Sequence, residues 1–108
     1  MKDKKMTKLE KIKEYDKTME VLYYALEKAI ENPAQKHRQL NIPYNICKYR
    51  ETIKFIKENY PNYYHNQYDL SLLNKKEEAL SKDDLIAWQL EVAIARGSLS
   101  GIEEKIGN

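Results

Sequence analysis

Apolar residues recur at alternating steps of three and four along two long stretches of this chain. They are Ile12, Tyr15, Met19, Leu22, Leu26 and Ala29 in the first stretch, and Ile42, Ile46, Tyr49, Ile53, Ile56 and Tyr60 in the second. This spacing places each set on one side of an α-helix, which has about 3.6 residues per turn. The sequence therefore predicts two long amphipathic helices. Joined by about ten residues, they would most simply pack antiparallel through their apolar stripes.

Sequence signals at both ends define the first helix. Thr7 followed by Glu10 forms a capping box, in which each side chain accepts a hydrogen bond from the other residue's free backbone amide. We therefore expect the helix to begin at Lys8 and residues 1–6 to form a charged, flexible tail. The helix should end at Asn32, because a residue that precedes a proline is pushed out of the α-helical backbone region.

The middle of the chain holds the second helix and a stretch rich in turn-forming residues. The helical spacing covers residues 43–60, and Pro61 stops the helix there. Residues 33–41 before it fit either a short helical turn or a plain connection. Residues 60–69 have no helical or strand periodicity, so we expect an ordered loop. Asp69 is placed to cap a short helix over residues 70–80.

The last quarter of the chain is expected to supply the centre of the core. Ser81 and Asp84 have capping spacing, and residues 85–95 then carry apolar side chains at nearly every angle around a helix. Such a helix should be enclosed by its neighbours. The dipeptide Arg96–Gly97 should end it, because a cation and then a glycine are typical of a helix C-terminus. Residues 98–106 fit one further capped turn.

These elements predict an all-α fold. We expect a compact bundle of four or five helices, in which two long antiparallel amphipathic helices pack with a C-terminal group around a buried helix that contains Trp88. A chain of 108 residues suits a single domain, which should span residues 7–108. The predicted core side chains are Leu22, Leu26, Ile53, Ile56, Leu85, Trp88 and Val92.

Composition excludes several kinds of protein. No apolar run approaches the roughly 18 residues that a membrane span needs, and no apolar segment follows the lysine-rich start as it would in a signal peptide. The single cysteine, Cys47, rules out an internal disulfide framework and suits a reducing compartment. We therefore expect a soluble, cytoplasmic protein without a membrane partner.

The sequence offers no pattern typical of catalysis or metal binding. Cys47 could pair with His37 or His65 as nucleophile and base, but their spacing matches no catalytic family, and a lone cysteine on an amphipathic helix is usually an apolar filler. Two histidines and one cysteine lack the paired ligands of a zinc motif. We predict no catalytic, cofactor-binding or metal-binding residue and no small-molecule substrate.

Tyrosine is the clearest compositional clue to function. The chain has nine tyrosines against one phenylalanine and one tryptophan, and tyrosine suits surfaces that are partly apolar and partly wet. Val21 and Tyr24 project away from the first apolar stripe, and Tyr44, Cys47 and Phe55 lie about 130° to 150° from the centre of the second. Whichever face stays exposed would have the composition of a protein interface. The predicted interface anchors are Tyr24, Tyr44, Phe55, Tyr63, Tyr64 and Tyr68.

A basic patch is expected on the second helix, beside the tyrosine-rich loop. It consists of Lys48, Arg50, Lys54 and Lys57. Cations interleaved with aromatic rings are typical of single-stranded nucleic-acid sites. However, the net charge is only +2, and only three of the 19 basic residues are arginine, whose planar fork suits phosphate best. A solvated face, or one that steers an acidic partner protein, fits better.

The function predicted from these features is a non-enzymatic protein–protein interaction module. It would be a homodimer, or a small inhibitor or regulator that docks on a larger protein. Its size and lysine-rich style are similar in general to accessory proteins of phages and mobile elements, including inhibitors of CRISPR defence, although no motif carries this likeness. The alternative is a nucleic-acid-binding accessory factor that uses the basic patch and the tyrosine-rich loop.

Overall fold

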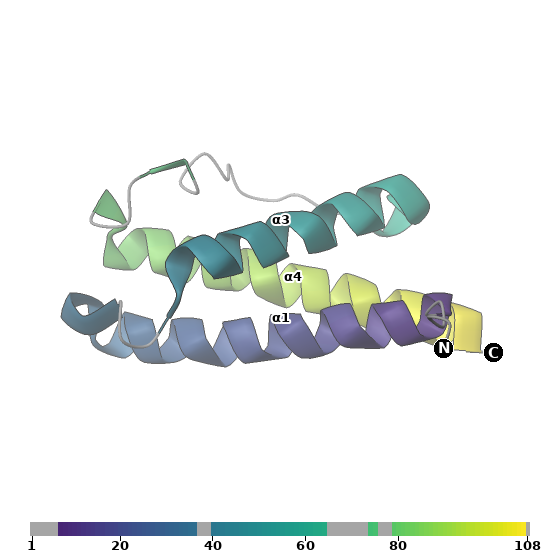
Figure 1. The fold of residues 1–108 in the computed structure, drawn as a ribbon, viewed down its shortest axis with the longest axis horizontal. Coiled ribbons are helices and arrows are strands. Elements are labelled where there is room, and N and C mark those ends of the chain that lie inside the picture. The colour runs from purple at the N-terminus through teal and green to yellow at the C-terminus, as the bar shows by residue number, and fades with distance from the viewer. Residues whose placement is uncertain (1–6, 37–39, 65–73, 76–78, 108) are drawn as a thin grey trace, which may run out of the picture.

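A computed structural model of the chain describes residues 7–36, 40–64, 74–75 and 79–107. These residues form three α-helices and two short 3-10 turns, with no strand among them (Figure 1). In chain order the elements are α1 (Lys8–Glu31), η1 (Pro33–Gln35), α3 (Ile42–Asn59), η2 (Pro61–Tyr63) and α4 (Lys82–Gly107). The expected all-α fold is thus confirmed, whereas the predicted tail of residues 1–6 lies outside the described residues.

Both predicted boundaries of α1 are confirmed. The Thr7 hydroxyl accepts a hydrogen bond from the Glu10 amide at 3.1 Å, and the Glu10 carboxylate accepts one from the Thr7 amide at 2.9 Å. The helix ends at Glu31, immediately before Asn32 and the proline that follows it. Along its length the predicted stripe faces inward. The fully buried members are Ile12, Met19, Leu22, Leu26 and Ala29.

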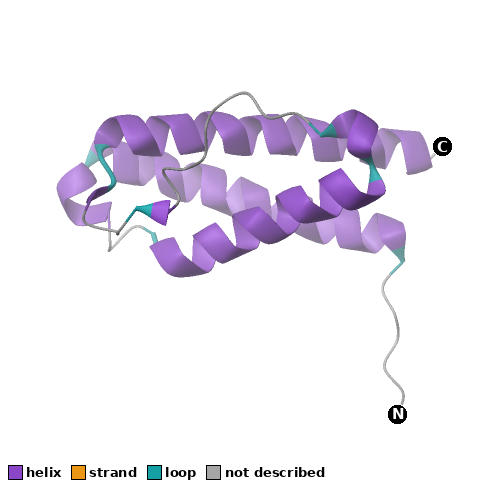
Figure 2. Cartoon of the chain, turned by 90° about the horizontal axis from the view of Figure 1, so that it is seen from above, coloured by secondary structure: helices purple, strands orange, loops and turns teal. Residues whose placement is uncertain are grey.

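The first helix packs mainly against the last one. Helices α1 and α4 run antiparallel side by side (Figure 1), and the Gln89 side-chain amide donates a hydrogen bond to the Tyr23 carbonyl at 3.3 Å. Helix α3 lies across this pair at an incline (Figure 2). The prediction that α1 and α3 pair through their stripes is therefore wrong in its choice of main partner. The reason is that α4 is long enough, at 26 residues, to cover the whole α1 stripe.

Helix α4 does not end at Gly97, contrary to prediction. It continues through Gly97 and Gly101 to Gly107, and residues 98–106 are part of it. A glycine within a helix costs about 1 kcal/mol. Burial of an aliphatic side chain contributes about 1.5–3 kcal/mol, and Leu99 and Ile102 are both fully buried beyond Gly97. This burial outweighs the local stop signal, so the C-terminal group is one helix.

The count of four or five helices is not confirmed, since the described part of the chain holds three. The short helix expected over residues 70–80 lies largely outside the described residues, although Leu80 is buried.

Most of the predicted core is found in the core. Its centre is Trp88 of α4, which is fully buried and meets Tyr49 of α3 edge to face, with ring centroids 6.3 Å apart. Six of the seven predicted residues are buried, while Ile53 is half-buried at the edge. The buried predicted residues are Leu22, Leu26, Ile56, Leu85, Trp88 and Val92.

Candidate interaction surfaces

The predicted interface anchors do not form one surface. Tyr24 on α1 and Tyr44 on α3 are 52% and 55% exposed, as expected. Phe55 is half-buried against other rings, with its centroid 4.9 Å from that of Tyr15. Tyr63 and Tyr64 are also half-buried and pack against the core, and Tyr68 lies outside the described residues.

Exposed apolar side chains lie on the neighbouring helices α1 and α4, and we call this set the apolar face. It consists of Val21 and Tyr24 on α1 with Ile86, Leu90 and Ala93 on α4. Val21 is 57% exposed, Leu90 43% and Ile86 36%. The three α4 residues follow steps of four and three, so they lie on one side of that helix. Four large apolar side chains thus meet solvent on two neighbouring helices.

Exposure of Ile86 and Leu90 corrects the prediction that their helix is enclosed by its neighbours. Three helices cannot surround one of their own members, so a helix that is apolar all round must leave part of its surface uncovered. The sequence already indicated this exposure. Residues 85–95 carry apolar side chains around more of the helix surface than a bundle of so few helices can cover.

A hollow of about 470 Å³ borders the apolar face between α1 and α4. Tyr24 and Ala93 line it, together with Gly97, where an added Cβ would have no heavy atom within 4 Å. At its polar end the Arg96 Nε lies 4.0 Å from the Asp16 carboxylate. Burial raises the pKa of Asp16, although the Arg96 charge acts against that rise. The hollow therefore joins an apolar wall to a charged rim, as protein interfaces do.

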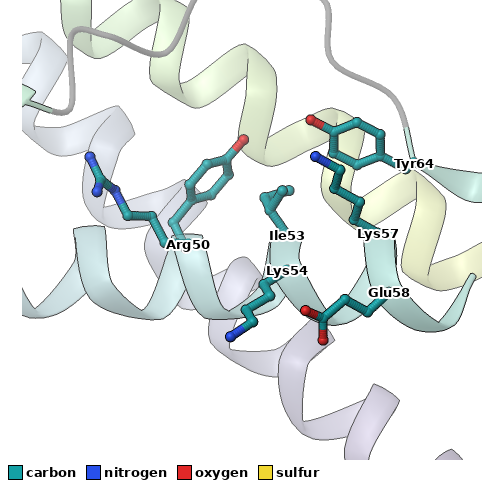
Figure 3. Close-up of a pocket in the computed structure, with 7 residues that line it drawn as sticks. Arg50, Ile53, Lys54, Lys57, Glu58 and Tyr64 are labelled. Atoms are coloured by element: carbon teal, nitrogen blue, oxygen red, sulfur yellow. The ribbon is translucent and has the colours of Figure 1, made fainter. Parts of the chain in front are cut away.

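A second hollow, of about 650 Å³, lies along α3, and we call it the basic groove (Figure 3). Its lining residues are Tyr49, Arg50, Ile53, Lys54, Lys57, Glu58 and Tyr64. Arg50, Lys54 and Lys57 follow steps of four and three along the helix. Figure 3 shows Ile53 between Arg50 and Lys57, with Lys54 and Glu58 pointing away from Tyr64.

The predicted basic patch is therefore partly assembled into a site. Three of its four members line the basic groove, whereas Lys48 pairs with Glu51 at 3.4 Å and its ammonium lies 5.7 Å from the Tyr44 ring centroid. Lys48 therefore lies outside the groove. The sequence spacing already separates it from the other three, because two residues turn a helix by about 200° and place Lys48 on the opposite side from Arg50.

Cations dominate the edge of the basic groove. The Lys57 ammonium lies 5.5 Å from the centroid of the Tyr64 ring, and the Arg50 guanidinium donates a hydrogen bond to the Asn74 side chain at 2.8 Å. Among the residues that the structure describes, no carboxylate lies within 4.0 Å of the charged nitrogens of Arg50, Lys54 or Lys57. The groove thus has three cations that no ion pair neutralises there.

The floor of the groove is apolar and buried. Tyr49 is only 1% exposed, and burial, with the nearby Glu91 carboxylate as a second cause, raises the pKa of the Tyr49 phenol. Ile53 is half-buried beside it. Tyr49 belongs to the second apolar stripe of the sequence, and the structure places it inside the core.

Little in the structure bears on catalysis. Cys47 is exposed on α3, and both histidines, His37 and His65, lie outside the described residues. Within the described ranges no three His, Cys, Asp or Glu side chains gather closely enough to hold a metal ion. None of the helices described here has the length and apolar character to cross a membrane.

Comparisons with protein-family models, with curated proteins and with solved structures found no match to this chain.

Proposed function

We propose that this protein is a non-enzymatic protein–protein interaction module that binds its partner through the apolar face. The observation that carries the proposal is the exposure of Val21, Tyr24, Ile86 and Leu90, which ranges from 36% to 57% on two adjacent helices. Large apolar side chains grouped on a surface and rimmed by charge are typical of protein interfaces. An exposed tyrosine is a common anchor, because its ring buries a large area at a small cost in conformational entropy.

Two kinds of partner suit the apolar face. If the partner is a second copy of the chain, the protein is a homodimer. If the partner is a larger protein, the chain is a small inhibitor or regulator of the type found among accessory proteins of phages and mobile elements, including inhibitors of CRISPR defence. Either partner fits the expected soluble, cytoplasmic location. Neither use requires a catalytic group, a cofactor, a metal ion or a small-molecule substrate.

The proposal is tested by a matched pair of tyrosine variants. Tyr24 and Tyr44 have nearly equal exposure, 52% and 55%, but only Tyr24 belongs to the apolar face. Light scattering at high concentration gives the solution mass of wild type, Tyr24→Ala, Tyr44→Ala and Leu90→Glu. If wild type is a dimer, Tyr24→Ala and Leu90→Glu should shift it toward monomer, and Tyr44→Ala should not.

If wild type is a monomer, the same variants serve in affinity capture from the native host. The proposal expects a captured protein that wild type and Tyr44→Ala retain and that Tyr24→Ala and Leu90→Glu lose. Equal behaviour of all four chains in both experiments would refute it.

Nucleic-acid binding by the basic groove is the second candidate function, and the specific observation in its favour is the row of Arg50, Lys54 and Lys57. Phosphate contacts are strongest at low salt, and each one adds about 0.7 to the logarithmic salt slope for a single strand. Three cations therefore predict that the logarithm of the binding constant falls with the logarithm of the salt concentration with a slope of about two at most. Undetectable oligonucleotide binding at about 50 mM salt would exclude this function.

A further inference from the structure

We infer that the basic groove binds an acidic peptide segment of a partner protein, which seats one apolar side chain over Ile53 and Tyr49 and places carboxylates against Arg50, Lys54 and Lys57. The inference depends on the groove alone. The hollow beside the apolar face is lined by α1 and α4, whereas α3 supplies the floor and all three cations of the groove.

Charge is the first argument for this occupant. Among the described residues, three cations line the groove against one carboxylate, Glu58, and none of the three is held in an ion pair. An acidic segment neutralises this excess. Arg50 and Lys57 are seven residues apart, and a rise of 1.5 Å per residue separates them by about 10 Å along α3. Carboxylates repeated at steps of three and four on a partner helix have the same spacing.

The apolar floor is the second argument. Ile53, half-buried between the cations, is the accessible part of this floor, on which an aliphatic or aromatic side chain can lose its contact with water, and the Tyr49 ring closes the groove beneath it. The volume of about 650 Å³ is within the range of 300–1,000 Å³ common for binding pockets. A ligand with charge alone would leave Ile53 wet, so the groove favours a segment that alternates acidic and apolar residues.

A nucleic acid fits the same groove less well. Among the described residues that line the groove, Tyr64 is the one partly exposed ring, and the Lys57 ammonium already lies 5.5 Å from its centroid. Arg50, the only arginine among the described residues of the groove, is already bonded to Asn74. Glu58 adds a negative charge that would repel phosphate. A peptide needs no stacking platform and can gain its affinity from the apolar anchor.

The test uses fluorescence anisotropy with a labelled peptide of about 15 residues that has glutamates at steps of four and three and one leucine between them. The protein variants are the double substitution Lys54→Glu, Lys57→Glu and a matched control, Lys82→Glu, Lys105→Glu. The control makes the same change in net charge at exposed positions near the two ends of α4. Circular dichroism establishes that both variants remain helical.

We expect the peptide to bind wild type and the control alike, and its dissociation constant to rise at least tenfold for the groove variant, because each attraction becomes a repulsion. Replacement of the peptide leucine by serine should weaken binding by about tenfold, since the apolar anchor is lost. Leu90→Glu should leave peptide binding unchanged, which separates this result from failure of the apolar face.

Four results would overturn the inference. They are no peptide binding at about 1 mM, equal dissociation constants for the groove and control variants, equal affinity for the leucine and serine peptides, and tighter binding of a labelled oligothymidine than of the peptide. The last result would assign the groove to nucleic acid.

Discussion

Alanine substitution of two glycines in the same helix should have different effects on stability. Gly97 and Gly101 both lie inside α4, and no described residue of the chain has the positive φ that would require glycine. Replacement of a helical glycine by alanine contributes about 0.8–1.0 kcal/mol to the free energy of unfolding. Local helix propensity alone therefore predicts the same gain at both sites.

The surroundings of the two glycines separate them. An added Cβ at Gly97 meets no heavy atom within 4 Å, so Gly97→Ala should keep the whole gain and raise the melting temperature by about 4 °C. An added Cβ at Gly101 lies 3.1 Å from Cε1 of Tyr63 and 3.5 Å from Cδ1. Tyr63 packs against the core from η2, and overpacking costs typically about 1–3 kcal/mol. The net effect of Gly101→Ala should thus lie between no change and a loss of about 2 kcal/mol.

Urea denaturation followed by far-UV circular dichroism measures both variants against wild type. A third chain, Tyr63→Ala with Gly101→Ala, supplies the control. Compared with Tyr63→Ala alone, it should regain most of the helix-propensity gain, because the ring is no longer there. Equal stabilisation by Gly97→Ala and Gly101→Ala would refute the packing argument and show that the Tyr63 ring yields without cost.

Three further substitutions probe other features. Asp84→Asn should cost about 1 kcal/mol at neutral pH, because it removes the negative charge that lies in the first turn of α4 and pairs with the Lys75 ammonium at 2.9 Å. The hydrogen bond from the Ser81 amide, as the largest cause, lowers the pKa of Asp84. The contribution of the carboxylate to stability is therefore present above about pH 4 and is lost as the pH falls through the lowered pKa. Urea titrations across acid pH measure this loss. Tyr49→Phe should flatten the alkaline loss of stability above about pH 10, because burial raises the pKa of Tyr49 and ionisation then opposes folding. Cys47→Ser should change the free energy of unfolding by less than about 0.5 kcal/mol, because Cys47 is exposed.

Each of these three expectations has a result that contradicts it. If Asp84→Asn and wild type lose stability in parallel through acid pH, the cap is not the source of the dependence. If Tyr49→Phe and wild type have the same alkaline slope, the phenol ionises without opposing folding. A large loss of stability in Cys47→Ser would mean that the thiol is buried in solution.

Features that depend on a few neighbouring residues could be predicted from the sequence. The Thr7 capping box, the stop before Pro33 and the inward stripe of α1 are local, and the structure has all three. The end predicted at Gly97 was wrong because that signal competes with the burial of Leu99 and Ile102, which depends on distant partners. Local patterns do not report how much apolar surface a neighbouring helix offers.

The candidate surfaces, too, could be predicted only where they depend on residues close together in the sequence. The steps that bring Arg50, Lys54 and Lys57 to one side of α3 were visible in the sequence. The apolar floor beneath them was not, since it requires the inclination of α3 over the α1–α4 pair. The burial of Phe55 likewise depends on Tyr15 of another helix.

The pairing of α1 with α4 delays folding during synthesis. The Gln89 side chain that bonds to the Tyr23 carbonyl is added 66 residues later. A ribosome that adds about 5–20 residues per second leaves α1 without this partner for roughly 3–13 seconds. During that time the α1 stripe is available to chaperones. Contacts so distant in sequence also slow the search for the native state compared with hairpin-like helical bundles. Emergence of α4 is therefore the event that commits the chain to its fold.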